Sequence, residues 1–301
     1  MKNTLLFLAA GMGSRYGGLK QLDQFGPNGE TLMEYSIYDG IKAGFEKIVF
    51  VIRRDFEQAF KETYIDKIKD KIEVDYVFQE LTALPEGYSV PDNREKPWGT
   101  GHAIMSAKDR IDGPFAVVNA DDFYGREAYQ IMYDFLTNLD TYDSTTYTII
   151  GYPLAKTLSE HGTVSRGVCE IDSEGNLIKV TERLKIGREN DGIYDHEDGR
   201  SHKLPGDTLV SMNLMGFDTS FFGYLDQYFT DFLDKSINDP KSEYLLPTVV
   251  NTLAQAGEVK VKILKTDAQW FGVTYQEDRP IVIKKIKEMV DKGLYPAKLW
   301  K

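Results

Sequence analysis

The chain has 301 residues, of which 42% are hydrophobic, and its formal net charge is −11 at neutral pH. This length and apolar content suffice for one large α/β domain or two small ones, and the acidic balance without a basic cluster argues against nucleic acid or an anionic membrane as a partner. The one cysteine, Cys169, excludes an internal disulfide, and no apolar run approaches the roughly 20 residues of a membrane helix, so we expect a cytoplasmic protein.

The first half of the chain alternates predicted strands with predicted helices. Apolar runs predict strands at 4–10, 47–52, 72–78 and 114–120. Helical periodicity predicts helices at 31–44, 55–70, 101–111 and 126–139. Gly44 stands where a C-cap glycine belongs. Strands separated by helices in this way indicate a mostly parallel sheet with right-handed crossovers.

The second half has a different character. Strand patterns with short turns are predicted at 147–154, 162–172, 176–184 and 207–218, followed by helices at 220–233 and 243–257, a strand at 259–265 and a helix at 279–293. We therefore predict an α/β fold: a Rossmann-like, mixed and mostly parallel sheet flanked by helices, with an antiparallel extension. The chain is predicted to be a single domain, 1–301, with lobes at 1–144 and 145–275 and a C-terminal helix at 276–301.

A glycine-rich loop follows the first predicted strand, in the stretch LLFLAAGMGSRYGGLKQ from Leu5 to Gln21. Such a loop at the carboxyl end of a strand is typical of phosphate binding. The dinucleotide pattern G-x-G-x-x-G fails because position 16 is tyrosine, and the second strand ends in VIRR rather than in an acid. The P-loop pattern fails because Leu19 precedes Lys20, and Gln21 replaces the hydroxyl that would hold Mg²⁺.

A third pattern, L-A-A-G-x-G-x-R with a later lysine, matches without a gap. Its residues are Leu8, Ala9, Ala10, Gly11, Gly13, Arg15 and Lys20. The stretch resembles the sugar-phosphate nucleotidyltransferases, most closely the glucose-1-phosphate thymidylyl- and uridylyltransferases and N-acetylglucosamine-1-phosphate uridylyltransferase. The resemblance implies that the first five residues bind the nucleotide. It also implies catalytic roles for Arg15, on the leaving pyrophosphate, and for Lys20, on the α-phosphate.

Further stretches resemble the same family in the same order along the chain. YVFQE implies that Gln79 reads the base, and WGTGHAI implies that Gly99 and Thr100 contact the nucleoside; we expect His102 to be structural. VVNADDFYG places the family's catalytic, metal-binding acid at Asp121, with Asp122 as the neighbour that could exchange roles with it. The stretches EHGTV, IKVTER and SMNLMGF imply that the sugar is bound by Gly162, Glu182, Arg183 and Asn213.

The chain departs from the family pattern in two places. An insertion at 81–98 separates the two nucleoside-contacting stretches, and we expect it to form a flap beside the base pocket, with Trp98 packed near the nucleotide. In WFGVT, Gly272 stands where many members carry a second metal-binding aspartate. Asp267 could substitute for that acid; we favour a metal held by Asp121 and substrate phosphates alone.

The resemblance implies an enzyme that condenses a nucleoside triphosphate, UTP or dTTP for preference, with a sugar 1-phosphate, using Mg²⁺ and releasing pyrophosphate. The first lobe would bind the nucleotide and the second the sugar phosphate. Two alternatives stay open: a cytidylyltransferase for an alcohol phosphate such as phosphocholine, and a non-catalytic nucleotide-binding regulator. The identity of the sugar also stays open, and a homo-oligomer is possible.

Overall fold

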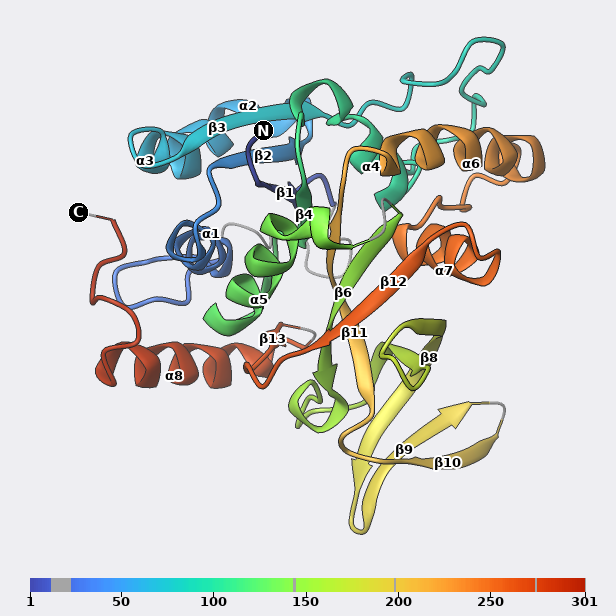
Figure 1. The fold of residues 1–301 in the computed structure, drawn as a ribbon. Helices are drawn as coiled ribbons and strands as arrows, with labels where there is room; N and C mark the ends of the chain where they lie inside the picture. The colour runs from blue at the N-terminus through green and yellow to red at the C-terminus, as the bar shows by residue number, and fades with distance from the viewer. Residues whose placement is uncertain (12–22, 143–144, 198, 274, 301) are drawn as a thin grey trace.

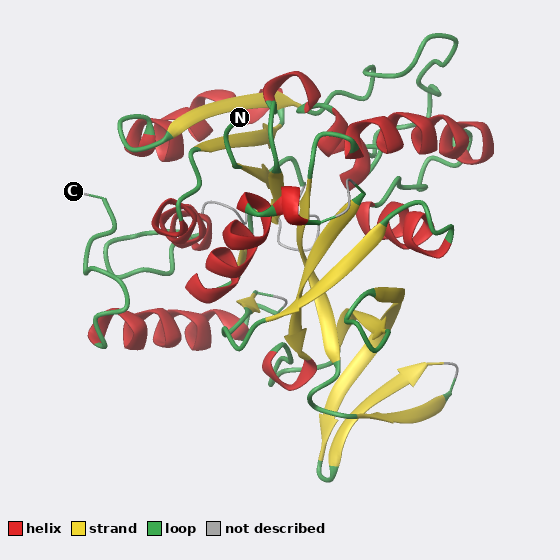
Figure 2. Ribbon diagram, viewed as in Figure 1, coloured by secondary structure: helices red, strands yellow, loops and turns green. Residues whose placement is uncertain are grey.

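The structure, a computed structural model, describes residues 1–11, 23–142, 145–197, 199–273 and 275–300. A long mixed sheet crosses the molecule, helices cover one half of it, and the sheet continues past them as an antiparallel extension (Figure 1; Figure 2). The predicted fold class, a mixed sheet flanked by helices, is confirmed. Among the described helices, none has the length and apolar character that crossing a membrane requires.

The described strands form one sheet in the order β10-β9-β8-β7-β11-β4-β1-β2-β3, with β6 between β11 and β12, and a separate pair, β5 and β13. Their bounds are β1 Thr4–Leu8, β2 Lys47–Ile52, β3 Glu73–Phe78, β4 Phe115–Asn119, β5 Asp122–Phe123, β6 Thr146–Pro153, β7 Val164–Ile171, β8 Leu177–Glu189, β9 Gly192–Glu197, β10 Arg200–Leu204, β11 Leu209–Phe217, β12 Lys260–Lys265 and β13 Phe271–Gly272. Pairing is parallel from β4 through β1 and β2 to β3 and between β6 and β12, and antiparallel elsewhere.

The helices pack on opposite faces of the sheet because successive residues of a strand point to opposite sides. Leu5 and Phe7 of β1 belong to an apolar cluster with α1 and α5, whereas Leu6 belongs to a second cluster with α4, α6 and α7. The bounds are α1 Leu32–Ala43, α2 Glu57–Phe60, α3 Asp66–Ile68, α4 Thr100–Met105, α5 Arg126–Thr137, α6 Phe221–Ser236, α7 Leu246–Gln255 and α8 Asp278–Asp291. These two clusters are the core that holds the strand ends in place.

Helix α1 shows how local sequence sets an element's ends. Thr31 caps its first turn in a capping box with Glu34, and the two hydrogen bonds measure 3.2 and 2.9 Å. Gly44 ends the helix in the left-handed region, at φ 115°, as predicted for a C-cap glycine. By contrast, the helix predicted over 55–70 is a series of short segments, because a π-helical turn at Lys61–Ile65 separates α2 from α3.

The insertion at 81–98 contains no helix or strand, and its end is fixed to the segment between α6 and α7. Arg94 is buried; its guanidinium donates to the carbonyl of Ser242 at 2.7 Å and lies 3.5 Å from the centre of the Trp98 ring. Trp98 is fully buried, and its indole N–H donates to the carbonyl of Leu81 at 2.9 Å. The Trp98 ring is enclosed by protein and offers no exposed surface, and its place near the nucleotide stays a prediction.

Two pairs of strands went unpredicted. The hairpin β9–β10 at the tip of the extension has mostly polar residues, GIYDHEDGRSHKL over 192–204, so no apolar alternation marks it (Figure 1). The pair β5–β13 is only two residues long on each side and joins segments almost 150 residues apart, with Phe123 opposite Phe271 and Asp122 opposite Gly272. Such short pairings depend on tertiary contacts rather than on a local pattern.

Candidate active site

The carboxyl ends of four parallel strands meet at one edge of the sheet. Leu8, the last residue of β1, pairs with Val51 on one side and with Asn119 on the other, and Phe78 of β3 pairs with Ile52. The described residues that follow these strands, among them Ala9 to Gly11 after β1, therefore lie along this edge. In open α/β sheets, ligands bind at such an edge.

The start of the glycine-rich loop continues the sheet beyond β1. Ala9 and Ala10 are buried, and the N–H of Ala9 donates to the carbonyl of Val51 at 2.9 Å, whereas Gly11 is exposed. Gly13, Arg15 and Lys20 lie outside the described residues. Their roles in binding and catalysis stay predictions.

The side chain of Gln79 belongs to a fixed hydrogen-bond network after β3. Burial lowers the pKa of His102, so its ring is neutral. Its Nε2 lies 2.8 Å from the carbonyl of Ala83 and therefore carries the proton, which leaves Nδ1 to accept from the Gln79 amide at 3.3 Å. The same amide nitrogen donates to the carbonyl of Gly99 at 2.9 Å. Both amide hydrogens are thus used, and Oε1 is the atom of this side chain that remains to accept a hydrogen bond from a ligand.

The backbone of Gly99 and Thr100 is shaped by the chain at Tyr244. Gly99 has φ 110°, and a Cβ there would lie 2.6 Å from the carbonyl oxygen of Tyr244, so only glycine fits. The hydroxyl of Thr100 accepts a hydrogen bond of 2.8 Å from the N–H of Leu246, at the start of α7. The fold alone therefore explains both residue types, while their position beside Gln79 keeps them at the predicted nucleoside site.

Asp121 and Asp122 follow β4 at the same edge. One oxygen of Asp122, Oδ2, accepts from the amide of Asn119 at 3.0 Å and lies 3.3 Å from the Tyr124 hydroxyl. Asp122 faces Gly272 across the β5–β13 pair, and a Cβ at Gly272 would lie 2.7 Å from its other oxygen, Oδ1. The carboxylate of Asp122 thus occupies the space that a side chain at position 272 would need.

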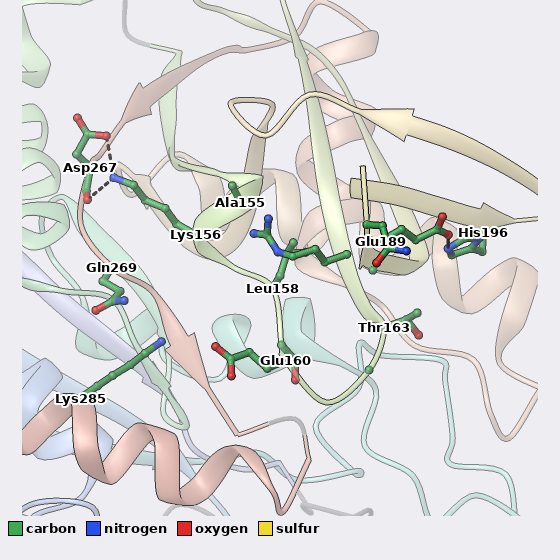
Figure 3. A pocket seen from close by; sticks show the side chains of 15 residues that line it. Ala155, Lys156, Leu158, Glu160, Thr163, Glu189, His196, Asp267, Gln269 and Lys285 are labelled. Carbon is green, nitrogen blue, oxygen red and sulfur yellow. Dashed lines mark hydrogen bonds and ion pairs between the residues drawn. The ribbon is translucent and has the colours of Figure 1, made fainter. Parts of the chain in front are cut away.

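The oxygen atoms at this edge are of the kind that Mg²⁺ prefers. In the described part of the chain, no three acidic, histidine or cysteine side chains lie close enough to hold a metal ion together, so a bound ion would also need phosphate or water oxygens. Asp267 lines a different pocket from Asp122. Its exposed carboxylate pairs with Lys156 at 3.0 Å, which lowers the pKa of Asp267 (Figure 3).

A cavity of about 240 Å³ lies beside Asp122, and the second lobe supplies two of the predicted sugar-binding side chains to it, Glu182 of β8 and Asn213 of β11. Asn213 lies at an irregularity of β11, with φ 64°, and is the one non-glycine residue of positive φ that the structure describes. Asparagine is among the few residues that tolerate this conformation, and such strain is common at binding sites. The cavity therefore lies between the two lobes, at the sheet edge that carries Asp121 and Asp122, which we call the acidic edge.

The other two predicted sugar-binding residues are not brought into this cavity. Gly162 lines a wider groove of about 990 Å³, whose walls carry polar side chains such as Glu160, Gln269 and Lys285 (Figure 3). A Cβ at Gly162 would lie 2.8 Å from the Tyr275 hydroxyl, which accounts for the glycine. Arg183 forms an ion pair of 3.2 Å with Asp195, a buried residue of the β9 hairpin.

Sequence reasoning missed two residues of the cavity wall, Arg166 of β7 and Trp270. Burial lowers the pKa of Arg166 to about 10, although the carboxylates of Asp122, Glu182 and Asp278 act to raise it. The sequence did hold a signal for Arg166: it is a charged residue at an inward position of an alternating strand, between Val164 and Val168. Charged side chains are rarely buried without a functional or structural partner. The position of Trp270 beside this residue, about 100 positions away in the sequence, had no such signal.

Comparisons with known proteins were made for sequence and for fold. The sequence model of a family described as "Nucleotidyl transferase" matches residues 6–273. A curated relative, the "Bifunctional protein GlmU" of Methanococcus maripaludis, is 28% identical over 187 residues, which cover 60% of this chain and 35% of the relative. The chain thus spans about a third of that relative's length.

Three solved structures share the fold over nearly the whole chain. A UDP-glucose pyrophosphorylase complexed with UDP-glucose has a TM-score of 0.62 at 17% identity, covering 96% of this chain and 99% of its own. The inositol-1-phosphate CTP transferase of T. maritima has a TM-score of 0.60 at 14% identity, covering 95% and 97%. A putative glucose-1-phosphate thymidylyltransferase of Bacillus anthracis has a TM-score of 0.63 at 11% identity, covering 95% of each chain.

Proposed function

The chain belongs to the nucleotidyl transferase family, and from this premise we propose that it condenses UTP or dTTP with a sugar 1-phosphate, giving a nucleotide sugar and pyrophosphate. An oxygen of the sugar phosphate attacks the α-phosphorus in line with the departing pyrophosphate. Such chemistry rests on positioning and on stabilisation of charge rather than on a covalent enzyme intermediate. The acidic edge and the cavity beside it supply a place for both substrates.

The network of Gln79 carries the preference for a uracil or thymine base. Its amide hydrogens are held by Gly99 and His102, so its Oε1 can only accept a hydrogen bond. Uracil and thymine present an N3–H donor on their base-pairing edge, whereas cytosine has an acceptor at N3 and its donor at the N4 amino group. A buried polar group that is paired by one ligand and left unpaired by another discriminates strongly between them. The Oε1 acceptor supports UTP and dTTP over CTP for a base bound with its N3 opposite Gln79.

The proposed catalytic roles belong to three residues. Lys20 would stabilise the α-phosphate and Arg15 the leaving pyrophosphate. Asp121, with Asp122 beside it, would hold Mg²⁺ together with substrate phosphates, and a bound Mg²⁺ would supply charge stabilisation at the phosphates. Glu182 and Asn213 would recognise sugar hydroxyls, because a carboxylate accepts from O–H groups and an amide both donates and accepts.

The test is pyrophosphate release from a matrix of five nucleoside triphosphates and several phosphorylated acceptors, including glucose 1-phosphate, N-acetylglucosamine 1-phosphate and phosphocholine. We expect release with UTP or dTTP and a sugar 1-phosphate, and none from the Asp121→Asn control under the same conditions. A preference for CTP with phosphocholine would replace the proposal with a cytidylyltransferase. Binding of nucleotide by calorimetry without release from any pair would replace it with a regulator.

A further inference from the structure

The wall of the 240 Å³ cavity holds a buried guanidinium whose geometry is fixed by the backbone. Arg166 is 7% exposed, and its Nε, Nη1 and Nη2 donate to the carbonyls of Thr157 and Ser165. These hydrogen bonds use three of the five N–H groups of a guanidinium. In the described residues, no carboxylate lies within ion-pair distance of Arg166. The carboxylates of Asp122, Glu182 and Asp278 attract this charge from beyond ion-pair distance, so the protein keeps a positive charge out of water without a direct ionic partner, which is costly.

A second buried donor without a partner lies against this guanidinium. Trp270 lines the same cavity, and the centre of its ring lies 4.7 Å from the Cζ atom of Arg166. Trp270 is 7% exposed, and its Nε1–H has no hydrogen-bond acceptor in the described part of the chain. A buried N–H without an acceptor destabilises the folded state by the full free energy of its desolvation. A ligand with acceptor oxygens would pair the indole N–H, and an anionic one would also supply a direct ionic partner to Arg166.

The strand pairing sets Arg166 against Arg183, the cation that the sequence resemblance assigns to the sugar side. The two residues are direct partners in the β7–β8 ladder. Arg183 forms its ion pair with Asp195, which is 1% exposed and belongs to β9. Arg166, by contrast, lines the cavity together with Asp122. The two side chains start from the same face of the ladder, and Arg183 turns to the hairpin whereas Arg166 turns to the cavity.

We propose that Arg166 and Trp270 form the subsite that binds the phosphate of the acceptor substrate, and that Arg183 serves to hold the β9–β10 hairpin. This inference rests on the proposed function for the identity of the anion as an acceptor phosphate. The location fits that role, because the acceptor phosphate must lie next to the acidic edge where the nucleotide reacts. Asn213 and Glu182, on the other walls of the cavity, would then bind hydroxyl groups of the sugar to which this phosphate is attached.

The subsite is tested by titrating the full-length protein with inorganic phosphate in a calorimeter, at constant ionic strength. Arg166→Met keeps the length of the side chain and removes its charge, and we expect it to raise the Kd for phosphate about tenfold or more, the scale of one charged hydrogen bond. Trp270→Phe keeps an aromatic ring and removes the N–H. We expect it to raise the Kd about threefold, and the unfolding temperature without phosphate measures separately what the smaller ring costs the fold.

Arg183→Met is the matched control, since it removes the other arginine of the ladder. We expect it to lower the unfolding temperature and to leave the Kd for phosphate within twofold. Arg15→Met controls for phosphate bound at the glycine-rich loop and should leave the effect of Arg166→Met in place. If Arg166→Met does not fold, Trp270→Phe carries the test, and an unchanged Kd in that variant overturns the proposal.

Two outcomes separate this proposal from the proposed function. Phosphate binding that depends on Arg166, in a protein that releases pyrophosphate from no substrate pair, would support the subsite and refute the function. Turnover of a sugar 1-phosphate with phosphate binding that depends on Arg183 rather than on Arg166 would support the function and overturn the subsite. Phosphate binding that is absent from the wild type would overturn the subsite as well.

Discussion

Asp39 should make the free energy of unfolding depend on pH, and the substitution Asp39→Asn should remove this dependence. Its carboxyl group is fully buried between α1, α5 and the C-terminal segment. The Tyr295 hydroxyl donates to it at 2.6 Å, and Nε of Arg126 lies 3.2 Å away. Both partners favour the charged form, yet burial outweighs them and raises the pKa of Asp39 from an ordinary 3.8 to about 6.

The sign of the effect follows from this direction. The folded state binds the proton of Asp39 more tightly than the unfolded state does. The contribution of Asp39 to the stability of the folded state is therefore fully present below the pKa of the unfolded state. Its contribution is lost as the pH rises from about 3.8 through about 6. A difference of about two pKa units corresponds to about 3 kcal/mol. Asparagine cannot ionise, so the free energy of unfolding of Asp39→Asn should rise by about 2 kcal/mol relative to wild type between pH 4 and pH 7, the part of this total that falls in that range.

The assay is urea unfolding of wild type and Asp39→Asn at unit steps between pH 4 and pH 7. The difference between the two proteins cancels the titration of the other carboxyl groups. Asp267→Asn is the control, because the Asp267 side chain is 73% exposed and its surface ion pair contributes little. A difference between wild type and Asp39→Asn that stays constant across this range would refute the reasoning, since it would mean that Asp39 titrates alike in both states.

Three other perturbations test the site and the insertion. Asp121→Asn should bind UTP but lose at least about a hundredfold in turnover, the scale of one main charge stabiliser. Turnover of this variant within a few-fold of wild type would shift the assignment to Asp122. Asp267→Ala should leave the Mg²⁺ dependence of the rate unchanged. Gln79→Ala should lower the preference for UTP over CTP, measured as kcat/KM, by about tenfold or more, and an unchanged preference would remove Gln79 from base recognition. Arg94→Met should lower the free energy of unfolding by about 2 kcal/mol or more, because the part-buried carbonyls of Asp239 and Ser242 would lose their donor. A loss below about 1 kcal/mol in urea unfolding would show that the insertion is not anchored by this residue.

Local patterns determined much of the architecture. The strand predicted at 47–52 coincides with β2, and the cap at Gly44 is where the sequence places it, because an apolar run and a glycine after a helix act over a few residues. The same holds for the order of strands and helices that leads to the carboxyl edge with Gln79 and Asp121. These features depend on neighbours along the chain, and neighbours along the chain are what a sequence displays.

Only the tertiary structure decided which side chains share the cavity. Trp98 stands next to Gly99 in the sequence, yet Arg94 and α6 enclose its ring. Arg183 follows Glu182, yet it turns to Asp195 of a hairpin that no apolar pattern marks. Arg166 meets Trp270 from a distant segment. Such contacts arise from strand register and from burial across the whole chain, and alternation along a strand cannot tell which distant element will cover each face.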